Sequence, residues 1–127
     1  MSQQVGVLDI TFKAATDSRT KQYYIMKPVG SATPYAVQIA TGVTDVTYGI
    51  LQNKPNVGEA AVVRVLGTSK LVSGTPLTEG LQVTVDSSGR GYYTATDKDI
   101  VVGIVLEPSA ATGDIIEVLV VHYKASI

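Results

Sequence analysis

The chain has 127 residues, of which 45% are hydrophobic and 17% are charged, with a net charge of −1 and no cysteine. This length fits one domain with a real core, but the charged share lies below the roughly 25% of a typical soluble domain, so we expect partners to cover part of the surface. The composition excludes disulfides, thiolate metal sites and thiol nucleophiles, and it gives no indication of nucleic-acid binding. The sequence shows no signal-peptide pattern and no apolar run of about 20 residues, so we expect a protein of the cytoplasm or of a particle assembled there.

Residues 1–20 are expected to form an extended N-terminal arm, ahead of a single β-rich domain over residues 21–127. A short apolar pattern in the arm is followed by small polar residues at positions 14–20. One interpretation is a mobile arm, and the other is an arm that becomes a strand when it meets the sheet edge of a partner. The apolar residues of the arm are Val5, Val7, Leu8, Ile10 and Phe12.

Short segments rich in β-branched and aromatic residues, separated by turn signals, predict strands throughout the domain. The expected strands are 21–27, 36–40, 46–52, 59–66, 69–73, 81–86, 92–96, 100–107 and 113–123. Gly67 and Thr68 predict a hairpin between two of them, and Gly103 indicates a bulge or a close approach of another backbone. The alternation at 81–86 predicts that Val83 points inward and Thr84 outward. The fold class is therefore all-β, a small barrel or sandwich with at most a helical turn near 108–112.

The last strand, 113–123, is expected to lie at the centre of the fold. Its sequence, GDIIEVLVVHY, is dominated by β-branched residues, which pack well on a pleated surface. Side chains alternate between the two faces of a strand, and here both faces are mostly apolar. We therefore expect both faces of this strand to be covered.

Turn residues mark the ends of several strands, where glycine and asparagine tolerate unusual backbone angles and proline presets a turn. Carboxylates beside these turns, Glu59, Glu79 and Asp114, are expected to bond nearby backbone N–H groups. The turn-forming residues singled out are Asn53, Pro55, Gly58, Glu59, Gly67, Gly89, Arg90, Gly113 and Asp114.

The sequence offers no convincing catalytic or metal site, so we expect a protein that is not an enzyme and holds no cofactor. His122 is the single histidine, and a general base would need a nucleophile and an orienting acid beside it. Asp97 and Asp99 flank a lysine, but the later ligands of a calcium loop are missing. A pair of carboxylates could still be brought together in space, although nothing selects one pair.

The chain contains seven tyrosines, one phenylalanine and no tryptophan. The adjacent pairs Tyr23–Tyr24 and Tyr92–Tyr93 are expected to place one ring inward and one at the surface. Such rings could stack on a sugar or a base, but without a basic groove a protein interface is favoured.

The order of motifs along residues 48–121 resembles the small capsid decoration, or cement, proteins of tailed phages. Residues 49–65 read GILQNKPNVGEAAVVRV and residues 101–120 read VVGIVLEPSAATGDIIEVLV. Between these two stretches stand Gly67, Lys70, Gly74, Gly80, Val83, Asp86, Gly89 and Arg90. The N-terminal third departs from the pattern of the family.

This resemblance implies a structural virion protein, similar in role to the phage lambda head decoration protein. It implies a homotrimer on the outer surface of the expanded capsid, made in the cytoplasm of the bacterial host, that binds the major capsid protein and stabilises the shell against internal DNA pressure. It implies no catalytic residue and no nucleic-acid, membrane or small-molecule partner, and it gives the arm a role in binding the capsid. The alternative is a carbohydrate- or surface-binding β-module of a virion.

Overall fold

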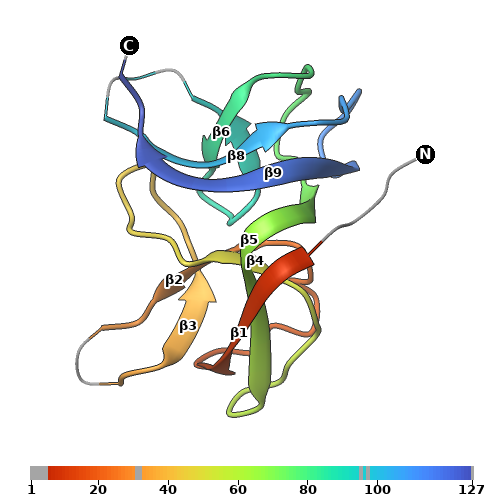
Figure 1. Ribbon diagram of the computed structural model, residues 1–127. Coiled ribbons are helices and arrows are strands. Elements are labelled where there is room, and N and C mark those ends of the chain that lie inside the picture. The colour runs from red at the N-terminus through yellow and green to blue at the C-terminus, as the bar shows by residue number, and fades with distance from the viewer. Residues whose placement is uncertain (1–5, 31–32, 95, 97, 127) are drawn as a thin grey trace.

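The computed structural model describes residues 6–30, 33–94, 96 and 98–126, and they form an all-β fold (Figure 1). The described residues contain no helix, and hence no helix that could cross a membrane. Bends and turns occupy 108–112, held to the rest of the fold by an isolated bridge between Ser109 and Leu77. The strands are β1 (Gly6–Ala14), β2 (Ile25–Pro28), β3 (Ala36–Ile39), β4 (Gly49–Leu51), β5 (Ala60–Val72), β6 (Gln82–Val85), β7 (Gly91–Tyr93), β8 (Ile100–Val105) and β9 (Ile115–Lys124).

The strands make one mixed nine-stranded sheet in the order β1-β3-β2-β4-β5-β9-β8-β6-β7. An additional pairing of β1 with β5 links the first five strands into a ring. The ring is partial, because β1 and β3 share only two parallel residue pairs, and it is not a regular barrel. The expected all-β class is thus confirmed, and β5 joins the ring to the β9-β8-β6-β7 half (Figure 1).

The hairpin expected at Gly67 and Thr68 is not formed, because β5 runs without reversal from Ala60 to Val72. Gly67 adopts a φ of 106°, a left-handed value that glycine allows at little cost. The register of β1 against β5 shifts opposite this residue, between Gly6 and Leu8. The glycine therefore marks an irregularity inside a long strand, where the two halves of the fold diverge.

β9 lies between β5 and β8, near the middle of the sheet, as the sequence predicts. Only one of its faces is covered along its length, however. Ile116, Val118 and Val120 are buried, whereas Ile115 and Leu119 on the opposite face are exposed. The expectation that both faces are covered is therefore wrong for the outer face at Ile115 and Leu119, although Glu117 on the same face is buried.

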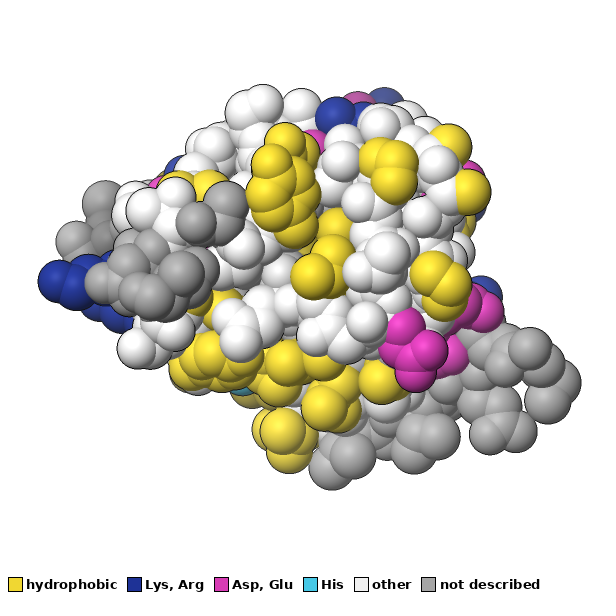
Figure 2. Space-filling view, turned by 90° about the horizontal axis from the view of Figure 1, so that it is seen from above, with side chains coloured by type: hydrophobic (Ala, Val, Ile, Leu, Met, Phe, Trp, Pro, Cys, Tyr) yellow, Lys and Arg dark blue, Asp and Glu magenta, His cyan; other side chains and the backbone are white. Residues whose placement is uncertain are grey.

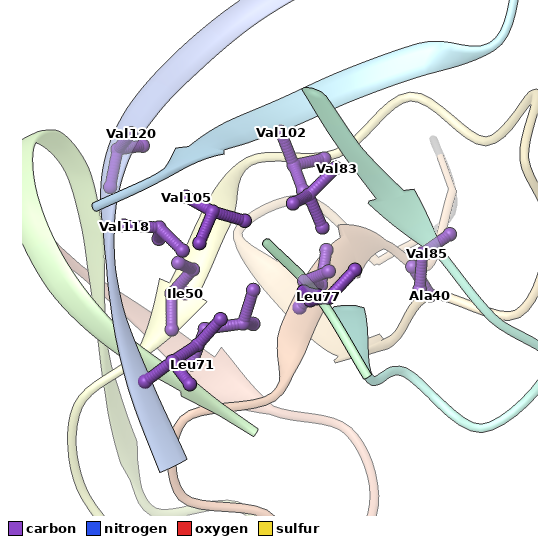
Figure 3. Close-up of a cluster of buried hydrophobic side chains, with 12 residues drawn as sticks. Ala40, Ile50, Leu71, Leu77, Val83, Val85, Val102, Val105, Val118 and Val120 are labelled. Carbon is purple, nitrogen blue, oxygen red and sulfur yellow. The ribbon is translucent and has the colours of Figure 1, made fainter. Parts of the chain in front are cut away.

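The hydrophobic core has two parts. The larger cluster, drawn in Figure 3, gathers side chains from β2, β4, β5, β6, β8 and β9 around Leu71 and Leu77. The smaller cluster fills the ring with Met26, Val37 and Val63. Burying apolar area at about 25 cal/mol per Å² is the main stabilising term of both clusters.

Two local predictions, the irregularity at Gly103 and the exposed side chain of Thr84, have different outcomes. The bulge predicted at Gly103 is present as a register shift between Val101 and Gly103. Thr84, expected to face water, is instead buried, and none of the described residues forms a hydrogen bond with its hydroxyl. The neighbouring Val83 is buried as predicted, so both faces of β6 are covered at this point.

Candidate functional site

The outer face of β9 is an exposed apolar surface on the described part of the molecule. Leu119 lies opposite Thr68 of β5 and Ile104 of β8. We call the β9 face the set of exposed apolar side chains on and beside this strand. Its members are Leu66 (49% exposed), Leu106 (45%), Ile115 (54%), Leu119 (41%) and Tyr123 (41%). Figure 2 shows hydrophobic side chains gathered along one side of a surface that carries few charges.

Two charged residues of β5 and β9 lie on the same side of the sheet as the β9 face. Lys70 of β5 and Glu117 of β9 are partners in the register of the two strands. Glu117 is buried, and none of the described residues donates a hydrogen bond to its Oε1. Lys70 extends its Nζ over the ring of Tyr23, 5.8 Å from the ring centre. The exposed part of the face is thus mostly apolar, because Glu117 is buried and Lys70 extends toward Tyr23.

The expected N-terminal arm contributes β1, which pairs antiparallel with β5 of the same chain. Val5 lies outside the described residues, and the side chain of Val7 is likewise not described. Leu8 pairs with Leu66 and is 47% exposed. The structure therefore brings Leu8 close to one end of the β9 face.

Ile10 and Phe12, the other two arm residues, line an open hollow at one end of the five-strand ring. The hollow has a volume of about 640 Å³ and is also lined by Pro28, Tyr35 and Tyr48. The ring of Phe12 stacks on Tyr48 with centroids 4.8 Å apart, and it lies 6.1 Å from Tyr35. Sequence reasoning missed this site because its aromatic residues are far apart in the chain and no single segment carries a signal.

The predicted turn at 53–59 connects β4 to β5 and is closed by its own polar side chains. Asn53 donates from Nδ2 to the carbonyl of Ala60, and the backbone N–H of Asn56 donates to Glu59 Oε1 at 2.6 Å. Pro55 is buried and its carbonyl accepts from the N–H of Ser18. Gly58, with φ 83°, donates its N–H to Ala14. The hydrogen bond from Gly58 to Ala14 therefore holds the end of β1 against this turn.

The other predicted turns are shaped in the same way by carboxylates. Asp86 Oδ1 accepts the N–H of Arg90, whose Nε lies 3.1 Å from Oδ2, and Gly89 between them has φ 81°. Asp114 Oδ2 accepts the N–H groups of residues 110 and 111, and Gly113 has φ 93°. These residues shape loops: both carboxylates accept backbone N–H groups, and Asp86 also accepts from the Arg90 side chain.

His122 forms a hydrogen bond with the backbone of β5. Its Nε2 lies 2.7 Å from the carbonyl oxygen of Val65, so this nitrogen carries the proton and donates it. A shallow pocket beside it is lined by no carboxylate among the described residues. Asp99 is buried and accepts from the N–H of Thr96, while Asp97 lies outside the described residues. The described residues contain no cluster of three metal-ligating side chains.

The positions of the two tyrosine pairs differ from the prediction that each pair lies in a strand with one ring on each face. The strand expected from residue 21 begins only at Ile25, and Tyr23 precedes it with φ 68°. The rings of Tyr92 and Tyr93 stack, with centroids 4.5 Å apart, and are not simply divided between two faces. Tyr93 is 42% exposed on β7, a strand that ends the sheet.

The sequence and the fold were compared with those of known proteins. Residues 2–121 match the phage cement protein family. The fold is similar to the crystal structure of the head fiber gp8.5 N base in bacteriophage phi29, with a TM-score of 0.71 and 16% sequence identity over 94% of this chain and 98% of that chain. No curated protein matches the sequence. Since the family match spans nearly the whole sequence, the chain belongs to the phage cement protein family and is a structural, non-enzymatic component of the phage head.

Proposed function

We propose that the chain binds the outer surface of the expanded capsid as a trimer, through the major capsid protein, and stabilises the shell against internal DNA pressure. The observation that carries the proposal is the exposed apolar β9 face in a member of the cement family. Large exposed apolar patches mark interaction surfaces, because leaving them in water is unfavourable.

Stabilisation follows from binding that is selective for the assembled shell. A ligand of one state shifts its stability by RT ln(1 + [L]/Kd), which is about 2.7 kcal/mol per site at a hundredfold excess over Kd. A trimer would engage three capsid contacts at once, so that weak individual contacts add up through avidity. No catalytic group is needed for this mechanism.

The β9 face is the proposed contact between copies. Leu119 and Ile115 would be removed from water there, at about 25 cal/mol per Å² of apolar area. The exposed part of the face is apolar apart from Lys70, since Glu117 is buried, so few charges would lose their hydration where copies meet around a threefold axis.

The N-terminal segment is the proposed contact with the capsid protein. Its candidate residues remain Val5, Val7, Leu8, Ile10 and Phe12. The closed turns at 53–59, 86–90 and 110–114 hold the strands that carry both surfaces, because their carboxylates and amides satisfy backbone groups that would otherwise be unpaired.

A second candidate function is binding of a carbohydrate or host surface through the Tyr92–Tyr93 pair. The stacked pair leaves Tyr93 partly exposed on a strand at the end of the sheet, where an aromatic ring could pack on a sugar. Binding to a glycan array that is lost in Tyr93→Ala would favour this function.

Sedimentation of the purified chain with expanded and with unexpanded shells tests the main proposal. We expect the chain to pellet with expanded shells at micromolar concentration and to stay in the supernatant with unexpanded ones. A chain that stays in the supernatant with both kinds of shell would contradict it.

A further inference from the structure

We propose that β1 accepts an extended segment of the shell protein along its open edge, and that alternate side chains of this segment fill the hollow lined by Phe12, Tyr35 and Tyr48. This inference rests on the proposed function and specifies how the N-terminal strand meets the capsid. In it, β1 stays on its own sheet and receives a strand. Addition of a strand to a sheet edge is a common mode of peptide recognition.

The backbone of β1 has an open edge on the side away from β5. The N–H of Ala14 donates to Glu59, toward β5, whereas the N–H of Lys13 donates to the carbonyl of Tyr35, on the other side. Because alternate residues of a strand direct their backbone groups to the same edge, Asp9 and Thr11 face the same side as Lys13.

β3 reaches β1 only at Lys13 and Ala14. Of the described residues, none forms a backbone hydrogen bond with Asp9 or Thr11 on this edge. Unpaired N–H and C=O groups in a row are a template for another strand. The open edge thus spans the same stretch of β1 whose side chains reach the hollow.

The hollow lies beside this edge and is uncharged. Ile10 and Phe12 reach it from β1, Val65 from β5, and Tyr48 from the segment before β4. None of its lining residues is ionisable at neutral pH. Its volume of about 640 Å³ is within the range of 300–1,000 Å³ that is usual for binding pockets. A strand added to β1 would direct every second side chain toward this hollow.

Tyr35 gives an independent indication of binding at the same place. It is 72% exposed and has φ 62°, a left-handed value that is costly for a large aromatic residue. Its carbonyl is held by the N–H of Lys13, and its ring stands 6.1 Å from Phe12 at the rim of the hollow. Strained residues of this kind gather where ligands are clamped.

The chemistry of the hollow defines its occupant. Because the lining offers aromatic and aliphatic groups without charge, the matching segment is extended and carries uncharged, apolar side chains at every second position. A charged side chain placed there would lose its hydration without gaining a partner. We assign the segment to the shell protein; a second copy of this chain is the competing occupant, and the experiment separates the two.

The experiment measures binding of full-length variants to expanded shells built from the capsid protein of the same phage. Thr11→Pro removes the N–H on the open edge and leaves the hydrogen bonds toward β5 in place, since proline is tolerated at such edge positions. Tyr35→Asn removes the ring, and asparagine tolerates the left-handed backbone. The matched controls are Thr11→Ala, which keeps the N–H, and Val57→Asn, which alters an apolar side chain that is 60% exposed outside the hollow.

We expect Thr11→Pro and Tyr35→Asn each to weaken binding at least tenfold, while both controls bind within twofold of the wild type and all four melt near its temperature. Hydrogen exchange adds a readout that does not depend on mutation: the amide of Thr11 should exchange fast in the free protein and at least tenfold more slowly on shells.

Several results would overturn the inference. If both variants bind like the wild type, or if the Thr11 amide stays unprotected on shells, the segment does not add to β1, although the proposed function stands. If Thr11→Pro instead lowers the solution mass of the free protein, the occupant is a second copy. If the wild type does not bind shells, the proposed function fails, and the assignment of the segment to the shell protein fails with it.

Discussion

Arg64 of β5 donates two parallel hydrogen bonds to Asp9 of β1, from Nε to Oδ1 at 2.8 Å and from Nη2 to Oδ2 at 3.0 Å. The same guanidinium donates from Nη1 to the carbonyl of Thr68. The hydrogen bond with Asp9 raises the pKa of Arg64 above its ordinary value. Residues 55 apart in the sequence are thereby joined, and β1 is fixed to the strand that links the two halves of the fold.

Asp9→Asn should lower the free energy of unfolding by about 0.5–1 kcal/mol, because a partly exposed but bidentate ion pair is lost. Denaturant unfolding at low and at high salt measures the effect, which should shrink as salt screens the pair. Asp17→Asn is the matched control, since Asp17 pairs bidentately with Arg19 only two residues away and joins no distant strands. Equal losses in the two variants would contradict a role for Asp9 in fixing β1.

Asp45 should make stability depend on pH in the acid range. Burial alone would raise its pKa, but hydrogen bonds from the N–H of Thr41, from Lys27 and from the N–H of Gly42 outweigh burial and hold the pKa below the ordinary 3.8. A carboxyl with a lowered folded-state pKa stabilises the fold above its unfolded pKa, and this stabilisation is lost as the pH falls through the folded value.

Wild type should therefore be more stable than Asp45→Asn at neutral pH, and the two should converge as the pH falls below the folded-state pKa of Asp45. Thermal unfolding across this range measures the difference. A difference that stays constant at all pH values would show that ionisation of Asp45 does not contribute.

Gly49→Ala should be strongly destabilising, by about 2–4 kcal/mol, through both backbone strain and overlap. Gly49 has φ 154°, and an added Cβ would overlap with the carbonyl oxygen of Arg64 on the neighbouring strand. Gly30 is a matched control, because its φ of 146° is similar but an added Cβ meets nothing within 4 Å. Comparable losses in both alanine variants would mean that the close approach of β4 to β5 does not matter.

The sequence predicts the central position of β9 and the bulge at Gly103, because β-branched runs and a glycine inside a strand have direct local causes. Gly67 shows the limit of such reasoning. A glycine with left-handed φ serves a hairpin or a kink equally well, and only the pairing of β5 with both β1 and β9 decides between them.

The candidate surfaces depend on contacts that local patterns do not contain. The apolar outer face of β9 could equally have been covered by another layer, and its exposure follows from the way the strands are distributed over the whole sheet. The hollow requires Phe12, Tyr35 and Tyr48 to meet from three separate segments. Alternation along one strand cannot reveal either feature.

Leu119→Glu should prevent the proposed association of copies without unfolding the chain, because it places a charge on the exposed β9 face. Light scattering should give three times the chain mass for wild type and the mass of one chain for the variant. Val57→Glu is the control, since Val57 is 60% exposed away from this face and should leave the mass unchanged. A wild-type mass of one chain, or a Leu119→Glu variant that keeps the wild-type mass, would contradict the proposed contact.

The melting temperature of DNA-filled heads that lack the chain, measured by calorimetry before and after the purified chain is added, tests the cement role most directly. We expect the transition to rise by several degrees and to saturate as the binding sites fill, because a ligand of the assembled shell stabilises it by mass action. A transition that stays at the same temperature while the chain is bound would show that it decorates the head without strengthening it.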